Sequence, residues 1–352
     1  MSEHYIRPDA RAYLDMIAAN PRPPIKQANK KETKRGDHYR GPGPRAYPNM
    51  TAATPRPPMS DAGIVQMRAI PKEMLDQMIG ALDLPVGDLG EMRDVVMPGP
   101  AGDMELRLFD VRASRAPGPV VVFYHGGGFV VGSIGTHAAL AAEVSRQLDL
   151  PVVSVEYRLA PEHKWPAAID DGIAAARWIA ANGAAFGREF TSIVLCGDSA
   201  GGNLTLVSAL ALRDEPAALP VILQIPIYPK ADSSRPHLSL ELFGDDYGLG
   251  RADMAYYDEA YAADPLDWRH SPLVADLAGL PPMVLATAGL DPLRDEGRGF
   301  AAKAVEAGCQ VVYREFAGTV HGFATFRKVI TSAQADLEVI MDHARRLLAE
   351  QS

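Results

Sequence analysis

Ser199 stands in a sequence setting that makes a serine hydroxyl chemically useful. Residues 192–204 read SIVLCGDSAGGNL, an apolar strand pattern that ends in Gly197, Asp198, the serine, Ala200 and Gly201. The G-x-S-x-G spacing is typical of a nucleophile elbow, a sharp strand-to-helix turn at which side chains on the two glycines would collide with neighbouring elements. The helical pattern AGGNLTLVSALAL begins directly after the serine, which favours an elbow over a glycine-rich turn with an incidental serine.

A serine hydroxyl is a weak nucleophile without a base and an orienting acid. In the strand–helix topology of such an elbow, these partners follow in the order Ser, Asp, His at later strand ends. Asp291 directly follows the apolar run PMVLATAGL, and His321 lies a few residues beyond CQVVYREF. Asp295 is the rival acid, although its place in a helix start suits capping better. His270 is the alternative base.

The stretch FYHGGGFVVGS, residues 123–133, could supply backbone N–H donors for the negative oxygen that develops during acyl transfer. Three successive glycines after a strand let backbone N–H groups approach a ligand with no side chain in the way. A phosphate loop is the competing interpretation, but Val131 occupies the last glycine position of G-x-G-x-x-G, and no G-x-x-x-x-G-K occurs. His125 and Gly126, which open the loop, are expected to support its shape. No HExxH or comparable spacing indicates a metal, and no cofactor is expected.

These candidate residues lie among alternating strand and helix patterns. The strand pattern DMELRLFDV alternates polar and apolar residues, whereas the other strand patterns are continuous apolar runs, typical of parallel strands covered on both faces. Those runs are PVVVFYHGG, PVVSVEYRL, TSIVLCGD, VILQIPIYP, PMVLATAGLD and CQVVYREFAG. Helical patterns between them cover residues 137–148, 167–181, 200–212, 294–307 and 333–350. We therefore predict an α/β fold with a mostly parallel sheet and helices on both faces.

Two segments depart from this rhythm. Residues 231–280 are longer than a simple crossover and rich in tyrosine, so we expect an insertion that forms a pocket above the strand ends. Before residue 91, helical patterns at 10–19 and 59–82 flank a basic segment, 21–60, rich in proline and glycine. The helical patterns should lie on an apolar surface, and the segment between them should be irregular. We predict a helical cap over residues 1–90 and a catalytic domain over residues 91–352.

Composition excludes several classes of partner. The net charge is −9 and the sequence pI about 5.5, so electrostatics favour neither nucleic acid nor an anionic membrane. The chain shows no signal-peptide pattern and no apolar run of the roughly 20 residues that a membrane span needs. Its two cysteines, Cys196 and Cys309, suit a reducing compartment, although a bridge between them stays open. We expect a soluble, cytoplasmic protein.

Five motifs together resemble the hormone-sensitive-lipase-like (bacterial family IV) carboxylesterases of the α/β-hydrolase fold. The motifs are HGGGF at 125–129, VEYRLAPEHKWPAAIDD at 155–171, GDSAGGN at 197–203, DPLRDEG at 291–297 and HGF at 321–323. The resemblance implies Ser199 as nucleophile, His321 as general base and then acid, and Asp291 as the residue that orients the imidazole. It also implies an oxyanion hole from the backbone amides of Gly127, Gly128 and Ala200. A cap over the site and a homodimer are further expectations.

The expected reaction is hydrolysis of short- to medium-chain carboxylic esters through an acyl-enzyme, with a small-molecule ester as the partner. Amide or carbamate hydrolysis, or acyl transfer to another acceptor, would use the same triad and stays open. A third class is a non-catalytic ligand receptor on the same fold. Plant gibberellin receptors resemble this family but lack the catalytic histidine, whereas His321 is present here in its HGF setting.

Overall fold

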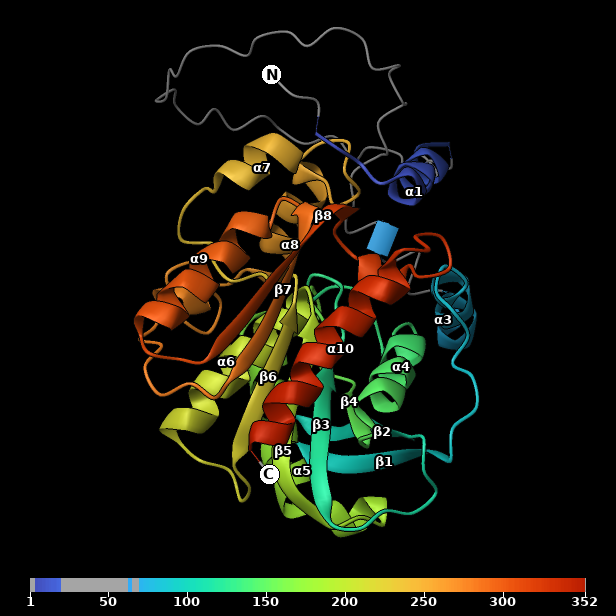
Figure 1. Ribbon diagram of the computed structural model, residues 1–352, viewed down its shortest axis with the longest axis vertical. Helices are drawn as coiled ribbons and strands as arrows, with labels where there is room; N and C mark the ends of the chain where they lie inside the picture. Colours follow the sequence, from blue (N-terminus) through green and yellow to red (C-terminus); the bar gives the residue numbers. More distant parts are fainter. Residues whose placement is uncertain (1–3, 20–62, 65–69, 352) are drawn as a thin grey trace, which may run out of the picture.

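One sheet of eight strands organises the chain (Figure 1). The computed structural model describes residues 4–19, 63–64 and 70–351, so the basic segment 21–60 lies outside the described residues. The strand order is β1-β2-β4-β3-β5-β6-β7-β8. Strand β2 pairs antiparallel with β1 and β4, and all other neighbours are parallel. The strands are β1 (Glu91–Gly99), β2 (Gly102–Asp110), β3 (Gly118–Tyr124), β4 (Val152–Val155), β5 (Phe190–Asp198), β6 (Val221–Ile227), β7 (Met283–Leu290) and β8 (Val311–Val320).

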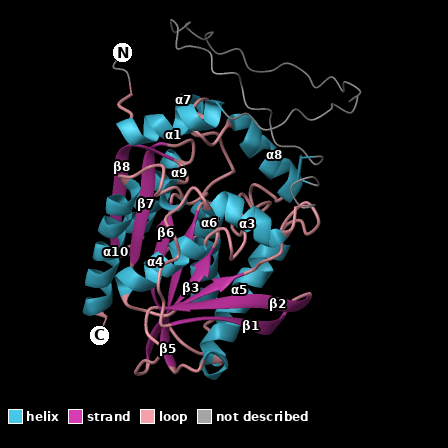
Figure 2. Cartoon of the chain, turned by 90° about the vertical axis from the view of Figure 1, so that its right-hand side faces the viewer, coloured by secondary structure: helices cyan, strands magenta, loops and turns pink. Residues whose placement is uncertain are grey.

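Helices cover both faces of the sheet, as predicted. In Figure 1, α4 and α10 lie in front of the sheet and α5 and α6 behind it; Figure 2 shows the layers from the side. The α-helices of the described residues are α1 (Pro8–Ala19), α3 (Lys72–Gly80), α4 (Ala138–Leu148), α5 (Ala167–Ala181), α6 (Ala200–Asp214), α7 (Leu238–Phe243), α8 (Arg251–Tyr261), α9 (Arg294–Glu306) and α10 (Ala333–Glu350). The bounds of α5 and α10 are those expected from the sequence.

The continuous apolar runs arise because each central strand contributes to two cores. In β3, Val120 and Val122 pack with the helices of one face, whereas Val121 and Phe123 pack with those of the other. Successive side chains of a strand point to opposite faces, so a strand covered on both sides must be apolar throughout. The sequence pattern therefore indicated the layers correctly.

Strand β1 was not identified from the sequence. It lies at the edge of the sheet, and Met97 is its one buried residue. Pro98 also lies within it, and proline is tolerated in a strand at an edge, where ladder hydrogen bonds are missing on one side. An edge strand of this kind carries little of the apolar signal that marks the central ones.

The two amino-terminal helices differ in how they pack. In α1, Ala10, Tyr13 and Leu14 are buried against the main core, as the apolar spacing predicted. Of the helical pattern predicted over residues 59–82, Ile64 is buried in the core, whereas helix α3 has no buried residue and leaves Met74 and Met78 exposed, so the prediction of an apolar contact surface fails for α3 alone. Polar contacts join α3 to the rest of the structure instead. Among the described residues, no helix has the length and apolar character needed to cross a bilayer.

A buried ion pair joins the segment after α3 to the segment after β8. The Nε and Nη2 atoms of Arg327 donate to the two carboxylate oxygens of Asp83 at 2.7 and 2.9 Å. Their side chains are only 1% and 3% exposed. Glu143 contributes a second, longer contact to the same guanidinium at 3.9 Å. Removing one partner of such a pair leaves a charge with little water around it.

We expect Asp83→Asn to lower the free energy of unfolding by about 3 kcal/mol, because Arg327 would keep its burial and lose its main counter-charge. Urea unfolding at neutral pH measures this loss. The matched control is Asp342→Asn, which removes an exposed carboxylate paired with Arg345 and should change stability by about 0.5 kcal/mol or less. Equal losses in the two variants would contradict a special role for the buried pair.

Candidate active site

Ser199 lies at the turn between β5 and α6, in a backbone conformation that few non-glycine residues adopt. Its φ is 55° and its ψ is −115°, and α6 begins at the next residue. Backbone hydrogen bonds hold the turn: Ser199 N donates to Ile227 O at 2.9 Å, and Ser199 O accepts Asn203 N at 3.0 Å and Lys230 N at 3.3 Å. Such strain costs on the order of 1–3 kcal/mol and persists only where surrounding structure enforces it. The surrounding hydrogen bonds thus hold Ser199 in this strained conformation.

The glycines on either side of Ser199 are required by close backbone contact. A Cβ atom on Gly197 would lie 2.6 Å from the carbonyl oxygen of Tyr124. One on Gly201 would lie 2.7 Å from the carbonyl oxygen of His125 and closer still to that of Tyr124. Both positions therefore face the backbone at the end of β3, which has no room to move away. This is the steric reason that the sequence pattern suggested.

The structure brings His321 and Asp291 to Ser199, although the three lie far apart along the chain. Nε2 of His321 is 2.9 Å from Ser199 Oγ, and Nδ1 is 2.7 Å from Asp291 Oδ2. With the carboxylate accepting the Nδ1 proton, Nε2 of the neutral ring is left to accept a proton from the serine hydroxyl. Asp291 is fully buried, and its other oxygen accepts Leu293 N at 2.8 Å, which fixes the carboxylate plane.

The rival candidates lie elsewhere. Asp295 accepts the backbone N–H of Ser239 at 2.9 Å, at the start of α7, and pairs with Arg294 and Arg298. It therefore caps a neighbouring helix rather than its own. His270 is buried in the wall of the adjacent pocket, and no hydrogen bond joins it to the serine hydroxyl among the described residues.

The glycine loop after β3 presents backbone amides beside the serine. Gly127 and Gly128 have φ values of 121° and 62°, and Gly127 O accepts Val130 N and Val131 N. A Cβ on Gly128 would lie 2.6 Å from the Tyr257 ring, so no side chain fits there. Within the described part of the chain, the amides of Gly127, Gly128 and Ala200 have no hydrogen-bond acceptor. Three unpaired donors next to a nucleophile suit a developing negative oxygen.

His125 supports this loop from beneath. The ring is fully buried, stacks on Tyr157 at 4.1 Å, and its Nδ1 donates to Gly126 O at 2.8 Å. Tyr157 donates its hydroxyl to His125 O at 2.6 Å. Burial, helped by the nearby His137, lowers the pKa of His125 to about 4. The imidazole is therefore neutral at ordinary pH, and it shapes the loop through its N–H without taking up a second proton.

Asp198 links the elbow to the glycine loop, a role that sequence reasoning did not identify. Its Oδ1 accepts Gly126 N at 2.9 Å and lies 3.4 Å from His137 Nε2. Although burial raises the pKa of this carboxyl, the charge of His137 and its hydrogen bond to the carboxylate hold that pKa below the usual range. The aspartate thus stays ionised beneath the loop. His137 was interpreted only as the start of a helix, because nothing in its local pattern indicates this partner.

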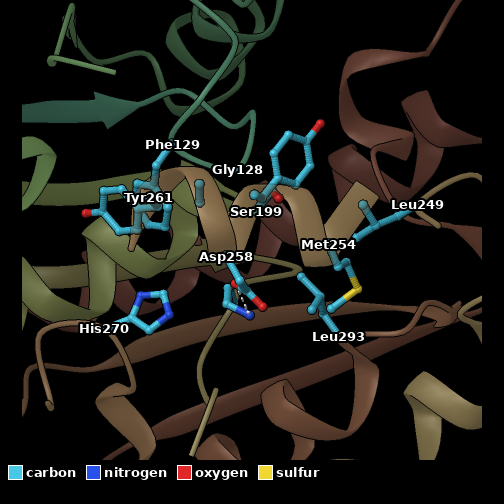
Figure 3. A pocket seen from close by; sticks show the side chains of 12 residues that line it. Gly128, Phe129, Ser199, Leu249, Met254, Asp258, Tyr261, His270 and Leu293 are labelled. Atoms are coloured by element: carbon cyan, nitrogen blue, oxygen red, sulfur yellow. Dashed lines mark ion pairs between the residues drawn. The ribbon is translucent and has the colours of Figure 1, made fainter. Parts of the chain in front are cut away.

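A pocket opens beside Ser199 (Figure 3). The space inside it, part of which is open to solvent, measures about 440 Å³. The apolar part of its wall comes from Phe129, Leu249, Met254, Tyr257 and Leu293, with Tyr261 stacked on Phe129 at 4.1 Å. Lys230, Asp258 and His270 make the polar part. Six lining residues belong to the segment 231–280, which sequence reasoning had placed above the strand ends.

Two tyrosines of that segment, Tyr257 and Tyr261, line the pocket, whereas Tyr247 packs on Phe243. Tyr228 was missed altogether, although it follows β6 directly. Its ring lies 4.8 Å from that of His321, and its hydroxyl donates to Asp198 Oδ2 at 3.4 Å. Position at a strand end was the signal that could have indicated it. Residues 4–19, 63–64 and 70–351 contain no group of three or more His, Cys, Asp or Glu side chains placed to hold a metal.

Comparison with known proteins gives a consistent picture. Residues 121–325, more than half of the chain, match the family described as the alpha/beta hydrolase fold. The carboxylic ester hydrolase LipN of Mycobacterium tuberculosis is 40% identical over 243 residues, which cover 66% of this chain and 64% of LipN. The chain thus spans just under two thirds of the length of LipN. An ethyl acetate hydrolase of Pseudomonas putida is 33% identical over 64% of this chain and 72% of its own.

A solved structure agrees over almost the whole length. An ester hydrolase from the metagenome of Lake Arreo, in complex with a derivative of bipyridine phosphonate, superposes with a TM-score of 0.79. It is 32% identical and covers 98% of this chain and 99% of its own. The similarity extends beyond the residues of the family match.

The neutral state of His125 should make stability depend on pH. Its pKa is about 4 when folded and about 6.5 when unfolded, so between these values the unfolded chain binds a proton that the folded one does not. The free energy of unfolding should therefore fall as pH drops from about 6.5 to 4. In His125→Asn this slope should be shallower by up to about 1.4 kcal/mol per pH unit.

Urea unfolding of both proteins at several pH values in this window measures the two slopes. The matched control is His163→Asn, which removes an exposed imidazole. The same change of slope in both variants would contradict the assignment to His125.

Proposed function

This chain belongs to the α/β-hydrolase family, in the hormone-sensitive-lipase-like branch of the carboxylic ester hydrolases, and we propose that it hydrolyses short- to medium-chain esters through an acyl-enzyme on Ser199. The predicted family and enzyme class are confirmed by the comparisons. The observation that carries the proposal is the chain of two short hydrogen bonds from Asp291 through His321 to Ser199 Oγ.

In the first half of the reaction, Ser199 Oγ attacks the ester carbonyl while His321 Nε2 accepts its proton. The imidazolium that forms is stabilised by Asp291, which holds the ring by its Nδ1–H. The carbonyl oxygen becomes negative and lies against the amides of Gly127, Gly128 and Ala200. Loss of one such donor typically costs on the order of 10²–10³ in rate.

The tetrahedral intermediate then collapses, and the alcohol leaves with the proton that His321 carries. Water enters the same position, gives its proton to His321 and attacks the acyl carbonyl of the acyl-enzyme. A second collapse releases the carboxylic acid and returns the proton to Ser199 Oγ. The buried braces His125 and Asp198 keep the loop amides in place through both halves, so little reorganisation accompanies the change in charge.

Short to medium acyl chains are supported by the composition of the pocket. Its wall mixes a few apolar residues with the polar side chains of Lys230, Asp258 and His270, so a small ester finds apolar contacts while the further methylenes of a long acyl chain meet polar groups or solvent. The name of the Pseudomonas putida relative, ethyl acetate hydrolase, describes a small ester as well. Ester hydrolysis is favoured over amide or carbamate hydrolysis, acyl transfer and a non-catalytic receptor, because the named relatives are ester hydrolases.

Residues 1–90 act as a cap and residues 91–352 as the catalytic domain in this proposal. Helix α3 supports a cap that touches the glycine loop, because Ser133 donates to Asp76 at 2.6 Å and Lys72 pairs with Glu156 at 2.8 Å. Glu156 in turn accepts Ile134 N at 2.7 Å. The cytoplasmic location and the homodimer stay predictions, the first supported by the low cysteine content.

Ser199→Ala should lower kcat for a nitrophenyl butyrate ester by on the order of 10⁶, because no acyl-enzyme can form. A nitrophenyl phosphonate should label the wild-type protein once per chain and leave the variant unlabelled, as read by intact mass. Ser114→Ala, which changes an exposed loop serine, is the matched control and should keep both properties. Labelling or turnover that survives in Ser199→Ala would reject the nucleophile.

A panel of nitrophenyl esters from acetate to palmitate tests the acyl preference. We expect kcat/KM for butyrate or hexanoate to exceed that for palmitate by at least about tenfold, because the methylenes of a long chain find no further apolar wall in the pocket. Assays above and below the solubility limit of the long esters separate preference from aggregation. Comparable turnover across the panel would rule out a pocket-limited acyl chain.

A further inference from the structure

Lys230 places a positive charge in a pocket whose wall is otherwise mostly apolar. It follows the end of β6 by three residues, and its backbone N–H donates to Ser199 O at 3.3 Å. The side chain is 14% exposed and lines the same pocket as Ser199. A substrate whose carbonyl lies at Ser199 therefore fills a space that includes this ammonium.

The ammonium has more hydrogen-bonding capacity than its surroundings use. Nζ carries three N–H donors, and its close partner is Asp258 Oδ1 on α8, at 3.5 Å, marked by a dashed line in Figure 3. A carboxylate at this distance, itself half exposed, satisfies one donor weakly. Since an incompletely paired ammonium is costly to bury, the pocket gains by receiving an oxygen acceptor.

His270 adds a second polar group to the pocket wall. Its side chain is 4% exposed, and its Nδ1 has no hydrogen-bond partner among the described residues. Burial, together with the charge of Lys230, lowers the pKa of His270 to about 3, so the ring is neutral. In Figure 3 its imidazole lies at the opposite end of the pocket from Leu249 and Met254, with Asp258 between them. The polar groups thus extend from the middle of the pocket to the end away from Leu249 and Met254.

The balance of charge around Lys230 decides what kind of acceptor fits. Besides Asp258, the carboxylates of Glu296 and Asp232 act on the ammonium and raise its pKa against the effect of burial. Glu296 is 4% exposed and already accepts Ala231 N and Asp232 N. Asp232 also pairs with Arg235 at 3.4 Å and with His237 at 2.8 Å, so the ammonium mainly faces the carboxylates of Asp258 and Glu296. An anionic group of the substrate would be repelled by these two carboxylates, whereas an uncharged oxygen can accept a hydrogen bond from the ammonium without that repulsion.

We propose that Lys230 makes this enzyme selective for esters that carry an uncharged oxygen acceptor (a ketone, ether or hydroxyl oxygen) in the part of the molecule that fills the pocket. The inference rests on the proposed function, because it places the scissile carbonyl at Ser199. Lys230 binds the acceptor oxygen, and Asp258 holds the ammonium at the pocket wall. The apolar residues contact the remaining carbon atoms of the same substrate.

Matched pairs of esters of equal chain length test this preference. On the acyl side the pair is methyl levulinate, which has a ketone oxygen, and methyl pentanoate, which has none. On the alcohol side the pair is methoxyethyl acetate and butyl acetate. Monomethyl succinate supplies the anionic alternative. Titration of the released acid at constant pH gives kcat/KM for each ester with wild type and with Lys230→Met, whose side chain keeps a similar length without the charge.

In at least one pair, Lys230→Met should lower the ratio of kcat/KM for the oxygenated ester to that for the alkyl ester by about tenfold to a hundredfold, the usual range for a hydrogen bond to a charged group. The ratio cancels the intrinsic reactivity of each ester. Lys230→Arg keeps a cationic donor and should retain part of the preference. Lys328→Met removes an exposed lysine outside the pocket and should leave every ratio unchanged.

Three results would overturn the inference. If Lys230→Met changes both members of each pair alike, Lys230 and Asp258 only tie α8 to the site. If monomethyl succinate is the preferred substrate of wild type, the acceptor is anionic. If Lys230→Met unfolds and Lys230→Arg keeps wild-type turnover with no oxygen preference, the lysine is structural. Failure of wild type to hydrolyse any of these esters would instead refute the proposed function itself.

Discussion

The approach of the β5–α6 turn to the end of β3 is the constraint on which the site depends. At Gly197 and Gly201 the backbone lies so close to the carbonyl oxygens of Tyr124 and His125 that no Cβ fits. Only this approach lets Ser199 take a φ of 55° and project its hydroxyl above the sheet. The same approach sets the start of the glycine loop beside the serine, because the loop begins where β3 ends. The proposed nucleophile and the proposed amide donors are therefore positioned by a single steric fit.

Beneath this fit lies a layer of buried polar groups whose charge states differ. His125 is held neutral by burial, whereas neighbouring charges keep the carboxylate of Asp198 ionised. Both side chains bind Gly126 of the loop: His125 donates to its carbonyl oxygen, and Asp198 accepts its N–H. Gly126 is thus fixed at both its donor and its acceptor. A loop held in this way needs little movement when a negative oxygen develops against its free amides, which is the electrostatic advantage of a preorganised site.

The pocket is built on a different principle. Half of its wall comes from the segment 231–280, which forms α7 and α8 between β6 and β7. Aromatic stacking of Tyr261 on Phe129 joins this segment to the glycine loop, and the Lys230–Asp258 pair joins it to the end of β6. In the proposed reaction the strand ends supply the reactive groups, and the inserted helices supply the surface that meets the rest of the substrate. The proposal therefore assigns chemistry and selectivity to separate parts of the chain.

Local sequence determined most of the elements and indicated the candidate reactive residues. Continuous apolar runs indicated the parallel strands, and G-x-S-x-G, the glycine loop and the order Asp291, His321 indicated the groups at their ends. These signals are strong because a covered strand and a tight turn each restrict residue type position by position. Edge strand β1 has one buried residue and carried no such signal. The apolar spacing of α3 predicted burial of its apolar side chains, but this helix contacts the rest of the protein through polar bonds to Ser133 and Glu156.

Tertiary structure alone decided which distant groups meet. His137 beneath the loop, Tyr228 against His321, and the joint position of Lys230, Asp258 and His270 follow from register between strands and from the docking of α8. No local pattern encodes them, because a single lysine or histidine after a strand is compatible with many neighbours. Burial and pairing depend on contacts across the fold, so the charge state of each group and the shape of the pocket emerge only when the chain is assembled.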